Sequence, residues 1–377
     1  MLASRKLFVP AAAGAPAAPA ATGAALSGQG GRRNPMRSAA TSLFVWAAAT
    51  LALALSSPAT AQTRLLFSSF TPLTQVINQR VFPAWIKEIE TATQGRVKIE
   101  MSPGSLAPPP GQLDLVQSGG ADIAWQFGGL VPHRLAMNQM LQIPSPTASA
   151  ETMTRALWRT HEKFFGPANE YKGLKLMALF TFGANYFFTV REPLNSVAQI
   201  RQMKVLTVPG SDAKAWGSLT TGVVTSPVAR YFELVSKGTV DAYTSTPIEP
   251  IVSFHLWKNT KYIVDLRDAK NASGFAVVMN EARWNSIPRA DQAALDKVSG
   301  EAFAKYMKGV DEVAEEASKK LAAEGVQRVA APDAVVNGVR QAYTFAESDW
   351  LAEAAKRGVD GRAALAFYRA QIREAAK

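Results

Sequence analysis

The chain has no cysteine and only three histidines in 377 residues. Without cysteine there are no disulfides, thiol nucleophiles or thiolate metal ligands, so the folded part depends on core packing for its stability. The histidines, His133, His161 and His255, are far apart in the sequence, and no HExxH motif is present. We therefore expect neither a metal site nor a cofactor.

Motifs of catalysis and nucleotide binding are also missing. The sequence contains no GxSxG nucleophile motif, no GxGxxG segment after a strand pattern and no Walker loop. Adjacent carboxylates such as Glu315 and Glu316 lie among lysines in a helical pattern, which is typical of a solvated helix face. These absences favour a binding protein over an enzyme, with an exported two-lobe enzyme or ligand sensor as the alternative.

The net charge of +11 does not indicate nucleic-acid binding. Five of the 41 basic residues lie among the first 61 positions, which contain no acidic residue, so the remaining chain carries 36 basic and 30 acidic residues. There the basic residues are scattered among acidic ones and form no run interleaved with aromatics, which a phosphate-binding surface would require. We expect no nucleic acid as a partner.

Residues 36–61 have the pattern of a secretory signal peptide. Arg37 is followed by the apolar run LFVWAAATLALAL, and the small residues Ala59-Thr60-Ala61 come directly after Pro58. The run is shorter than the roughly 20 apolar residues that a transmembrane helix needs. We therefore expect export to the periplasm, with cleavage near Ala61.

Residues 1–35, which precede this signal, are interpreted as a disordered leader or an overextended start. They are rich in alanine, glycine and proline and show no apolar period. Translation begins at Met1 under the first interpretation and at Met36 under the second. After cleavage, about 315 residues remain, which is long enough for two lobes with separate cores.

Alternating strand and helix patterns predict an α/β protein with two lobes. Helical patterns separate the apolar segments, and a long amphipathic pattern over 288–325 leads into further helical stretches that end at Lys377. The expected strands are Arg64–Phe67, VKIEM, ADIAWQF, KLMALF, KVLTV and FAVVMN. An α/β core is thus followed by a helical C-terminal region.

Two short repeats suggest that the second lobe resembles the first. VKIEMSPGS and KVLTVPGS both pass from a strand into Pro-Gly-Ser, and LVQSGGAD matches LVSKGTVD farther along the chain. In open α/β sheets, ligands bind outside the carboxyl ends of strands, where glycine allows close approach and helix N-termini offer free N–H groups. The repeats therefore predict a binding cleft between the lobes.

Aromatic, amide and hydroxyl residues gather at the predicted strand ends. For any one aromatic residue, core packing is the commoner outcome, but the set as a whole is typical of a ligand site. The candidate ligand contacts from this pattern are Phe70, Trp125, Gln126, Phe127, Asn185, Tyr186, Tyr243, Ser245 and Thr246.

Several stretches together resemble the periplasmic solute-binding proteins of TRAP transporters, of the dicarboxylate-receptor type. The resemblance covers roughly residues 63–350 and is specific only when its parts are combined. It is carried by IKEIETATQGRVKIEMSPGSL, PPPGQLDLVQSGGADIAW, KGLKLMALFTFG, REPLNSVAQIRQMKVLTVPGS and VVTSPVARYFELVSKGTVDAYTSTP.

The resemblance implies a two-lobed periplasmic binding protein fold with hinge strands and a long connecting helix. It also implies that a small organic solute is held between the lobes and delivered to TRAP-type membrane permease subunits. The predicted boundaries are 62–184 with 272–310 for lobe I, and 185–271 with 311–377, including the C-terminal helices, for lobe II.

The chain departs from the family at the arginine that holds a ligand carboxylate. Leu206 stands at that position, or Thr207 if a one-residue insertion lies earlier, and Asn185 stands where sialic-acid-type members have a second arginine. None of these side chains can form the bidentate, charge-assisted contact of a guanidinium. We therefore expect a solute with one carboxylate or none and an apolar or aromatic part. Arg134 is a further candidate contact.

Overall fold

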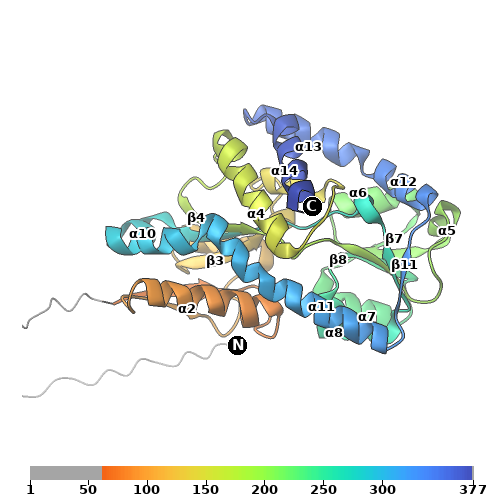
Figure 1. Cartoon of the computed structure of the whole chain (residues 1–377), viewed down its shortest axis with the longest axis horizontal. Helices are drawn as coiled ribbons and strands as arrows, with labels where there is room; N and C mark the ends of the chain where they lie inside the picture. Colours follow the sequence, from red (N-terminus) through yellow and green to blue (C-terminus); the bar gives the residue numbers. More distant parts are fainter. Residues whose placement is uncertain (1–61, 376–377) are drawn as a thin grey trace, which may run out of the picture. The chain divides into compact units, whose positions relative to one another are not determined.

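The computed structural model describes residues 62–375 (Figure 1). The predicted leader and signal peptide, and the expected cleavage near Ala61, lie outside the described residues. Between residues 62 and 375, no helix is long and apolar enough to cross a membrane. In the same range, no three acidic or histidine side chains are grouped closely enough to hold a metal ion.

The first sheet has five strands in the order β2-β1-β3-β10-β4. β1 is parallel to β2 and β3, whereas β10 is antiparallel to β3 and β4. The carboxyl ends of β1 to β4 therefore share one edge with the amino end of β10. The strands are β1 (Thr63–Ser68), β2 (Val97–Met101), β3 (Ile123–Phe127), β4 (Leu174–Phe180) and β10 (Phe275–Asn280).

The second sheet has six strands in the order β11-β9-β5-β8-β6-β7. Only β5 is antiparallel to its neighbours, so the carboxyl ends of the other five strands share an edge with the amino end of β5. The strands are β5 (Tyr186–Thr189), β6 (Lys204–Thr207), β7 (Gly222–Thr225), β8 (Ala242–Thr246), β9 (Tyr262–Asp265) and β11 (Gln327–Ala330).

Two crossing segments connect these carboxyl edges. Residues 181–185 lead from β4 to β5, and residues 266–274 lead from β9 to β10. The segments pair with each other through an antiparallel bridge between Ala184 and Ala272, and the Asn185 N–H donates to the Asn271 carbonyl oxygen at 2.8 Å. Strand ends from both sheets therefore adjoin one shared connection, as expected for a hinge.

Helices pack on the sheets and complete their cores. The helix α11 contacts α4 near the first sheet and α8 near the second, so it is the long connecting helix that was predicted (Figure 1). The helices are α2 (Phe82–Ala92), α3 (Gln112–Gln117), α4 (Ala150–Thr160), α5 (Val197–Gln202), α6 (Ser211–Leu219), α7 (Tyr231–Ser236), α8 (Glu249–Ser253), α9 (Glu281–Asn285), α10 (Arg289–Val298), α11 (Lys308–Ala323), α12 (Asp333–Ala342), α13 (Thr344–Lys356) and α14 (Gly361–Ala375).

The C-terminal helices divide their contacts between the two sheets. α12 packs on α6, which belongs to the second sheet, whereas α13 packs on residues 137–142 and α14 on α4, beside the first sheet. Trp350 of α13 is buried and donates its indole N–H to the Ala136 carbonyl oxygen at 3.1 Å. This packing differs from the predicted grouping of all residues 311–377 with lobe II.

The predicted continuous helix over 288–325 is interrupted after α10. Ser299 is extended, Gly300 has φ +60°, and a 3₁₀ segment over Gly300–Met307 leads into α11. The Trp158 ring lies 2.7 Å from where a Cβ of residue 300 would be, so only glycine fits there. The apolar period continues through the break, which explains why the sequence pattern alone suggests one helix.

The two repeats differ in their structural meaning. Asp122 and Asp241, which end LVQSGGAD and LVSKGTVD, each accept a backbone N–H of the adjacent strand, from Leu66 at 2.7 Å and Lys204 at 2.9 Å. This repeat joins equivalent helix–strand units. The Pro-Gly-Ser repeat does not, because the first copy follows the edge strand β2 and the second follows the inner strand β6.

Candidate ligand-binding site

An aromatic cluster lies at the carboxyl edge of the first sheet. The Phe70 ring stacks on the Trp125 ring at 4.1 Å between centroids, and the Phe182 ring approaches the Phe275 ring edge-on at 5.0 Å. Trp125 is fully buried, whereas Phe70, Phe127 and Phe182 are half-buried. The partly exposed rings give this edge an apolar surface on which the aromatic or aliphatic part of a ligand can pack.

Hydrogen bonds fix the orientation of Trp125. Its indole N–H donates to Ser69 Oγ at 2.9 Å, and the Ser69 hydroxyl donates to Asn78 Oδ1 at 2.9 Å. Ser69 follows the end of β1, and Trp125 occupies the middle of β3. The cluster is therefore built on rigid strand ends, which favours a preformed site.

Gln126 is the neighbour of Trp125 and is completely buried. Its amide nitrogen donates to the carbonyl oxygens of Pro109 at 3.1 Å and Phe127 at 3.0 Å. Two acceptors on one nitrogen fix the amide orientation, and Gln126 Oε1 is then left without a hydrogen-bond donor in the described structure. A buried carbonyl oxygen without a donor is costly, so Gln126 remains a candidate ligand contact.

Hydroxyl groups occupy the corresponding edge of the second sheet. Thr207 Oγ1 and Ser245 Oγ lie 2.7 Å apart at the ends of β6 and β8, and both residues are buried. Ser245 has φ +63°, a left-handed conformation that residues other than glycine rarely adopt. Thr246 is also buried, opposite Tyr186 in the β5–β8 register. All three residues thus lie at or near the carboxyl ends of their strands, and their role as ligand contacts stays a prediction.

Tyr243 and Leu206 do not belong to that edge. They are paired in register on β8 and β6, and both are fully buried in a core cluster with Phe188 and Tyr231. The Tyr243 ring stacks on Phe188 at 4.8 Å, and its hydroxyl is hydrogen-bonded to Thr260 Oγ1 at 2.5 Å. Their complete burial among core side chains disfavours the predicted role of both residues as ligand contacts.

Arg134 and Asn185 have protein partners. The guanidinium of Arg134 is ion-paired with Asp114 and donates to Gln117 Oε1 at 2.8 Å, both on α3. The side-chain amide of Asn185 donates to Asn271 Oδ1 at 3.0 Å and holds the crossing segments together. These contacts disfavour a role for Arg134 as the ligand clamp and give Asn185 a structural one.

Lys270 is a buried cation beside the second edge that the sequence reading missed. Its ammonium donates to Asp265 Oδ1 at 2.8 Å and lies 4.9 Å from the Tyr186 ring centroid. Burial alone would raise the pKa of Asp265, but hydrogen bonds from Lys270 and from the Arg267 N–H hold it below its usual value. Lys270 lies in the second crossing segment, and no motif in the sequence indicated it.

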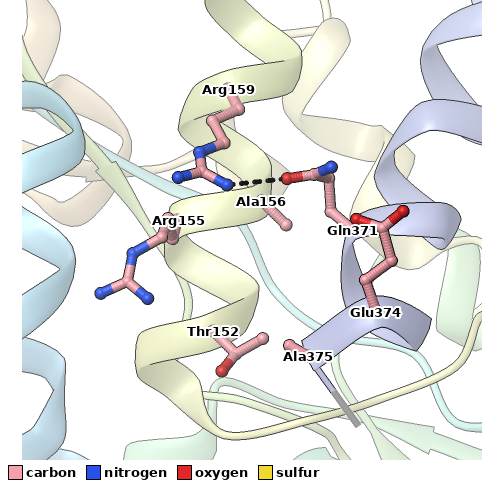
Figure 2. A pocket seen from close by; sticks show the side chains of 7 residues that line it. All are labelled: Thr152, Arg155, Ala156, Arg159, Gln371, Glu374 and Ala375. Atoms are coloured by element: carbon pink, nitrogen blue, oxygen red, sulfur yellow. Dashed lines mark hydrogen bonds between the residues drawn. The ribbon is translucent and has the colours of Figure 1, made fainter. Parts of the chain in front are cut away.

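A crevice lies between α4 and α14, and residues of these two helices alone line it (Figure 2). It has a volume of about 350 Å³, and its arginines are engaged: Arg159 donates to Gln371 Oε1 at 2.9 Å, and Arg155 pairs with Glu151 at 2.6 Å. Arg159 also pairs with Glu301 at 2.7 Å. With these arginines already paired, the crevice offers a ligand little charge, and its contacts connect the C-terminal helix to the first lobe.

Two α/β sheets whose carboxyl edges are joined by paired crossing segments, with aromatic and hydroxyl side chains at those edges, define a bilobal solute-binding protein. Comparison with known proteins agrees. Residues 67–347 match the profile of the bacterial extracellular solute-binding protein family 7, named DctP. The chain belongs to this family and is a solute-binding protein of the TRAP type, which confirms the predicted resemblance and the two-lobed fold.

The matches to individual relatives extend over nearly the whole length of each relative. The outer membrane transporter protein TsaT of Comamonas testosteroni is 35% identical over 325 residues, which are 86% of this chain and 96% of the relative. A periplasmic TRAP solute-binding protein of Bordetella bronchiseptica, solved with (R)- and (S)-mandelate, is 28% identical with a TM-score of 0.76, covering 83% of this chain and 99% of that chain. A marine metagenome protein solved with 3-hydroxybenzoate and described as specific for aromatic acids is 25% identical, with a TM-score of 0.73 and coverages of 84% and 100%.

Proposed function

We propose that the protein captures a small organic acid with one carboxylate and an aromatic or similarly apolar body. The observation that carries this proposal is the Phe70–Trp125 stack with half-buried Phe127 and Phe182 beside it at the edge of the first sheet. Aromatic rings offer stacking partners for another ring, which a short dicarboxylate does not need.

The second lobe supports the same solute class. Where the family's carboxylate-binding arginine is expected, this lobe has Leu206, which is buried, or Thr207, whose hydroxyl is hydrogen-bonded to Ser245. At the position of the second arginine, Asn185 is hydrogen-bonded to Asn271. Two carboxylates of a dicarboxylate would lose their hydration there without paired guanidinium groups. The mandelate and 3-hydroxybenzoate of two solved relatives agree with a single carboxylate attached to a ring.

The proposal includes export and delivery. The signal peptide would be removed near Ala61, and the loaded protein would pass its solute to TRAP-type membrane permease subunits in the periplasm. The solute would be released unchanged, so the protein is proposed to be a binder and not an enzyme. Native mass spectrometry that recovers an intact co-purified aromatic acid would support this, whereas a chemically altered product would favour the alternative of a two-lobe enzyme.

Titration calorimetry with mandelate, benzoate and 3-hydroxybenzoate is expected to give one-to-one binding for at least one of them. Succinate at the same concentrations is expected not to displace the bound aromatic acid, because Leu206 or Thr207 stands where the family's clamping arginine is expected and neither can pair a second carboxylate. Competitive displacement by succinate at micromolar concentration would contradict the proposed solute class.

Substitution of Phe70 by leucine is expected to weaken aromatic-acid binding by on the order of 1 to 3 kcal/mol, because it removes the ring that stacks on Trp125. Phe254→Leu is the matched control, since Phe254 is also half-buried but packs against the core cluster of the second sheet. Calorimetry measures both. Equal losses in the two variants would show that Phe70 acts through stability and not through ligand contact.

A further inference from the structure

A second, larger cavity of about 570 Å³ lies on the C-terminal helices, remote from the strand edges. Its walls come from α12, α13 and α14, from the crossing segment at Asp268 and from the loop Ile143–Pro146. None of the proposed solute contacts lines it. Its volume is in the range of small-molecule sites, and it is open to solvent.

The lining carries an excess of positive charge from four arginines. Arg362, Arg369 and Arg373 are spaced by seven and four residues, so they share one face of α14, and Arg340 approaches from α12. Only two carboxylates, Asp268 and Glu347, are present among the lining residues. The formal charge of the lining is therefore positive by two.

Two of these arginines are held in place by protein partners. Arg340 pairs with Asp268 at 2.6 Å, and Arg369 pairs with Glu347 at 3.0 Å while donating to the Pro144 carbonyl oxygen at 3.1 Å. Within residues 62–375, Arg362 and Arg373 form no ion pair or side-chain hydrogen bond with a protein group. The cavity thus combines fixed guanidinium groups with others whose donors are available.

We propose that this cavity is a second binding site, for a doubly charged tetrahedral oxyanion, namely phosphate or the phosphate group of a small organic molecule. Guanidinium groups bind such oxyanions through paired, charge-assisted hydrogen bonds, and several of them around one concave site can share the acceptor oxygens. The hydroxyl groups of Ser145, Thr344 and Ser348 also lie in the lining, but each already donates to a backbone carbonyl oxygen, so the arginines are the donors that carry the proposal.

The site is also connected to the hinge. Tyr343 lines the cavity and donates its hydroxyl to Asp212 Oδ1 at 2.7 Å, and Asp212 also accepts from Asn271 in the second crossing segment at 2.7 Å. Elements packed on both sheets therefore line the proposed oxyanion site. This differs from the solute site, which lies at the strand edges themselves.

Titration calorimetry of the exported chain in phosphate-free buffer tests the proposal with inorganic phosphate and glycerol 3-phosphate as separate probes. We expect one phosphate site per chain, with a Kd below about 1 mM at low salt and weaker binding as salt rises. The Arg362→Gln/Arg373→Gln variant should lose at least about tenfold in affinity, since each charge-assisted contact contributes on that order. Arg230→Gln on the second lobe should bind phosphate as the unmodified chain does.

A gain-of-binding variant makes the test independent of lost stability. Glu347→Gln removes a carboxylate that competes for Arg369, so it should tighten phosphate binding while aromatic-acid binding stays unchanged. Tighter binding of glycerol 3-phosphate than of phosphate would identify an organic phosphate as the ligand, and the reverse would identify the free ion. Absence of phosphate binding, or equal weakening in Arg230→Gln, would overturn the proposal.

Discussion

Replacing Asp212 by alanine is expected to lower the free energy of unfolding by about 2 to 5 kcal/mol, because it leaves two buried donors without an acceptor. Asp212 is 6% exposed and stands in the first turn of α6. Its Oδ1 accepts from the Asn271 amide and from the Tyr343 hydroxyl, each at 2.7 Å. Urea denaturation measures the loss.

The contacts among Asp212, Asn271 and Tyr343, which form a buried hydrogen-bond network, explain the size of the effect. Within residues 62–375, no lysine or arginine pairs with Asp212. Its buried carboxylate is therefore stabilised by these two hydrogen bonds and by the positive end of the α6 dipole. Burial, together with the Asp212 charge, raises the pKa of Tyr343 well above its usual value. The phenol therefore stays protonated and acts as a donor.

Tyr343→Phe provides the matched control for this prediction. It removes one donor but keeps the ring and the acceptor's second partner, so a smaller loss of about 1 to 2 kcal/mol is expected. In the double variant, the two losses should not add, because both act on one hydrogen bond. A loss below about 1 kcal/mol for Asp212→Ala would show that water replaces the network.

The elements of this fold follow from local signals that the sequence displays. VKIEM, KLMALF and FAVVMN form strands because their apolar runs are bounded by turn residues, and LVQSGGAD and LVSKGTVD mark equivalent units through their aspartates. The Pro-Gly-Ser repeat does not mark equivalent strands, because a turn after a strand does not reveal whether that strand lies at the edge of its sheet or inside it. The break at Gly300 depends on Trp158, which is distant in sequence.

Site residues are harder to predict because burial and ligand contact select the same residue types. Trp125 and Tyr243 both occur in apolar strands, yet Trp125 joins half-buried rings at a sheet edge and Tyr243 packs on Phe188 in the core. Phe182 follows a predicted strand within KGLKLMALFTFG, so the same strand-end rule would have included it. The Asp212–Asn271–Tyr343 contacts join segments far apart in the sequence, and no local pattern encodes them.

Replacing Glu249 by glutamine is expected to change how the stability of the protein depends on pH. Glu249 begins α8, directly after β8, and is 6% exposed. Burial raises its pKa to about 8, against the opposing hydrogen bond from its own backbone N–H. Its Oε2 has no hydrogen-bond partner in the described structure. The folded protein therefore keeps this carboxyl group protonated at neutral pH.

The sign of the effect follows from where the proton is held. Below about pH 4.5, Glu249 is protonated in both states, and its contribution to stability is fully present. As pH rises toward 8, only the unfolded chain ionises, so the folded state loses about 1.4 kcal/mol per pH unit relative to it. Glutamine cannot ionise. The difference in unfolding free energy between Glu249→Gln and the unmodified chain should therefore grow in favour of the variant across this window.

Comparing variants removes the other titrating groups from the measurement. Burial also raises the pKa of Glu170 to about 7 and lowers the pKa of His161 to about 4. As pH rises, the first shift lowers the free energy of unfolding and the second raises it, so the pH profile of either protein alone combines opposing slopes. Both groups are common to the two proteins and cancel in the difference. Urea denaturation at pH 5 and pH 8 should show the variant gaining on the order of 3 to 4 kcal/mol between the two conditions. Glu316→Gln, at an exposed position of α11, should show no such gain. A pH-independent difference for Glu249→Gln would mean that the carboxylate is ionised in the folded protein and solvated despite its burial.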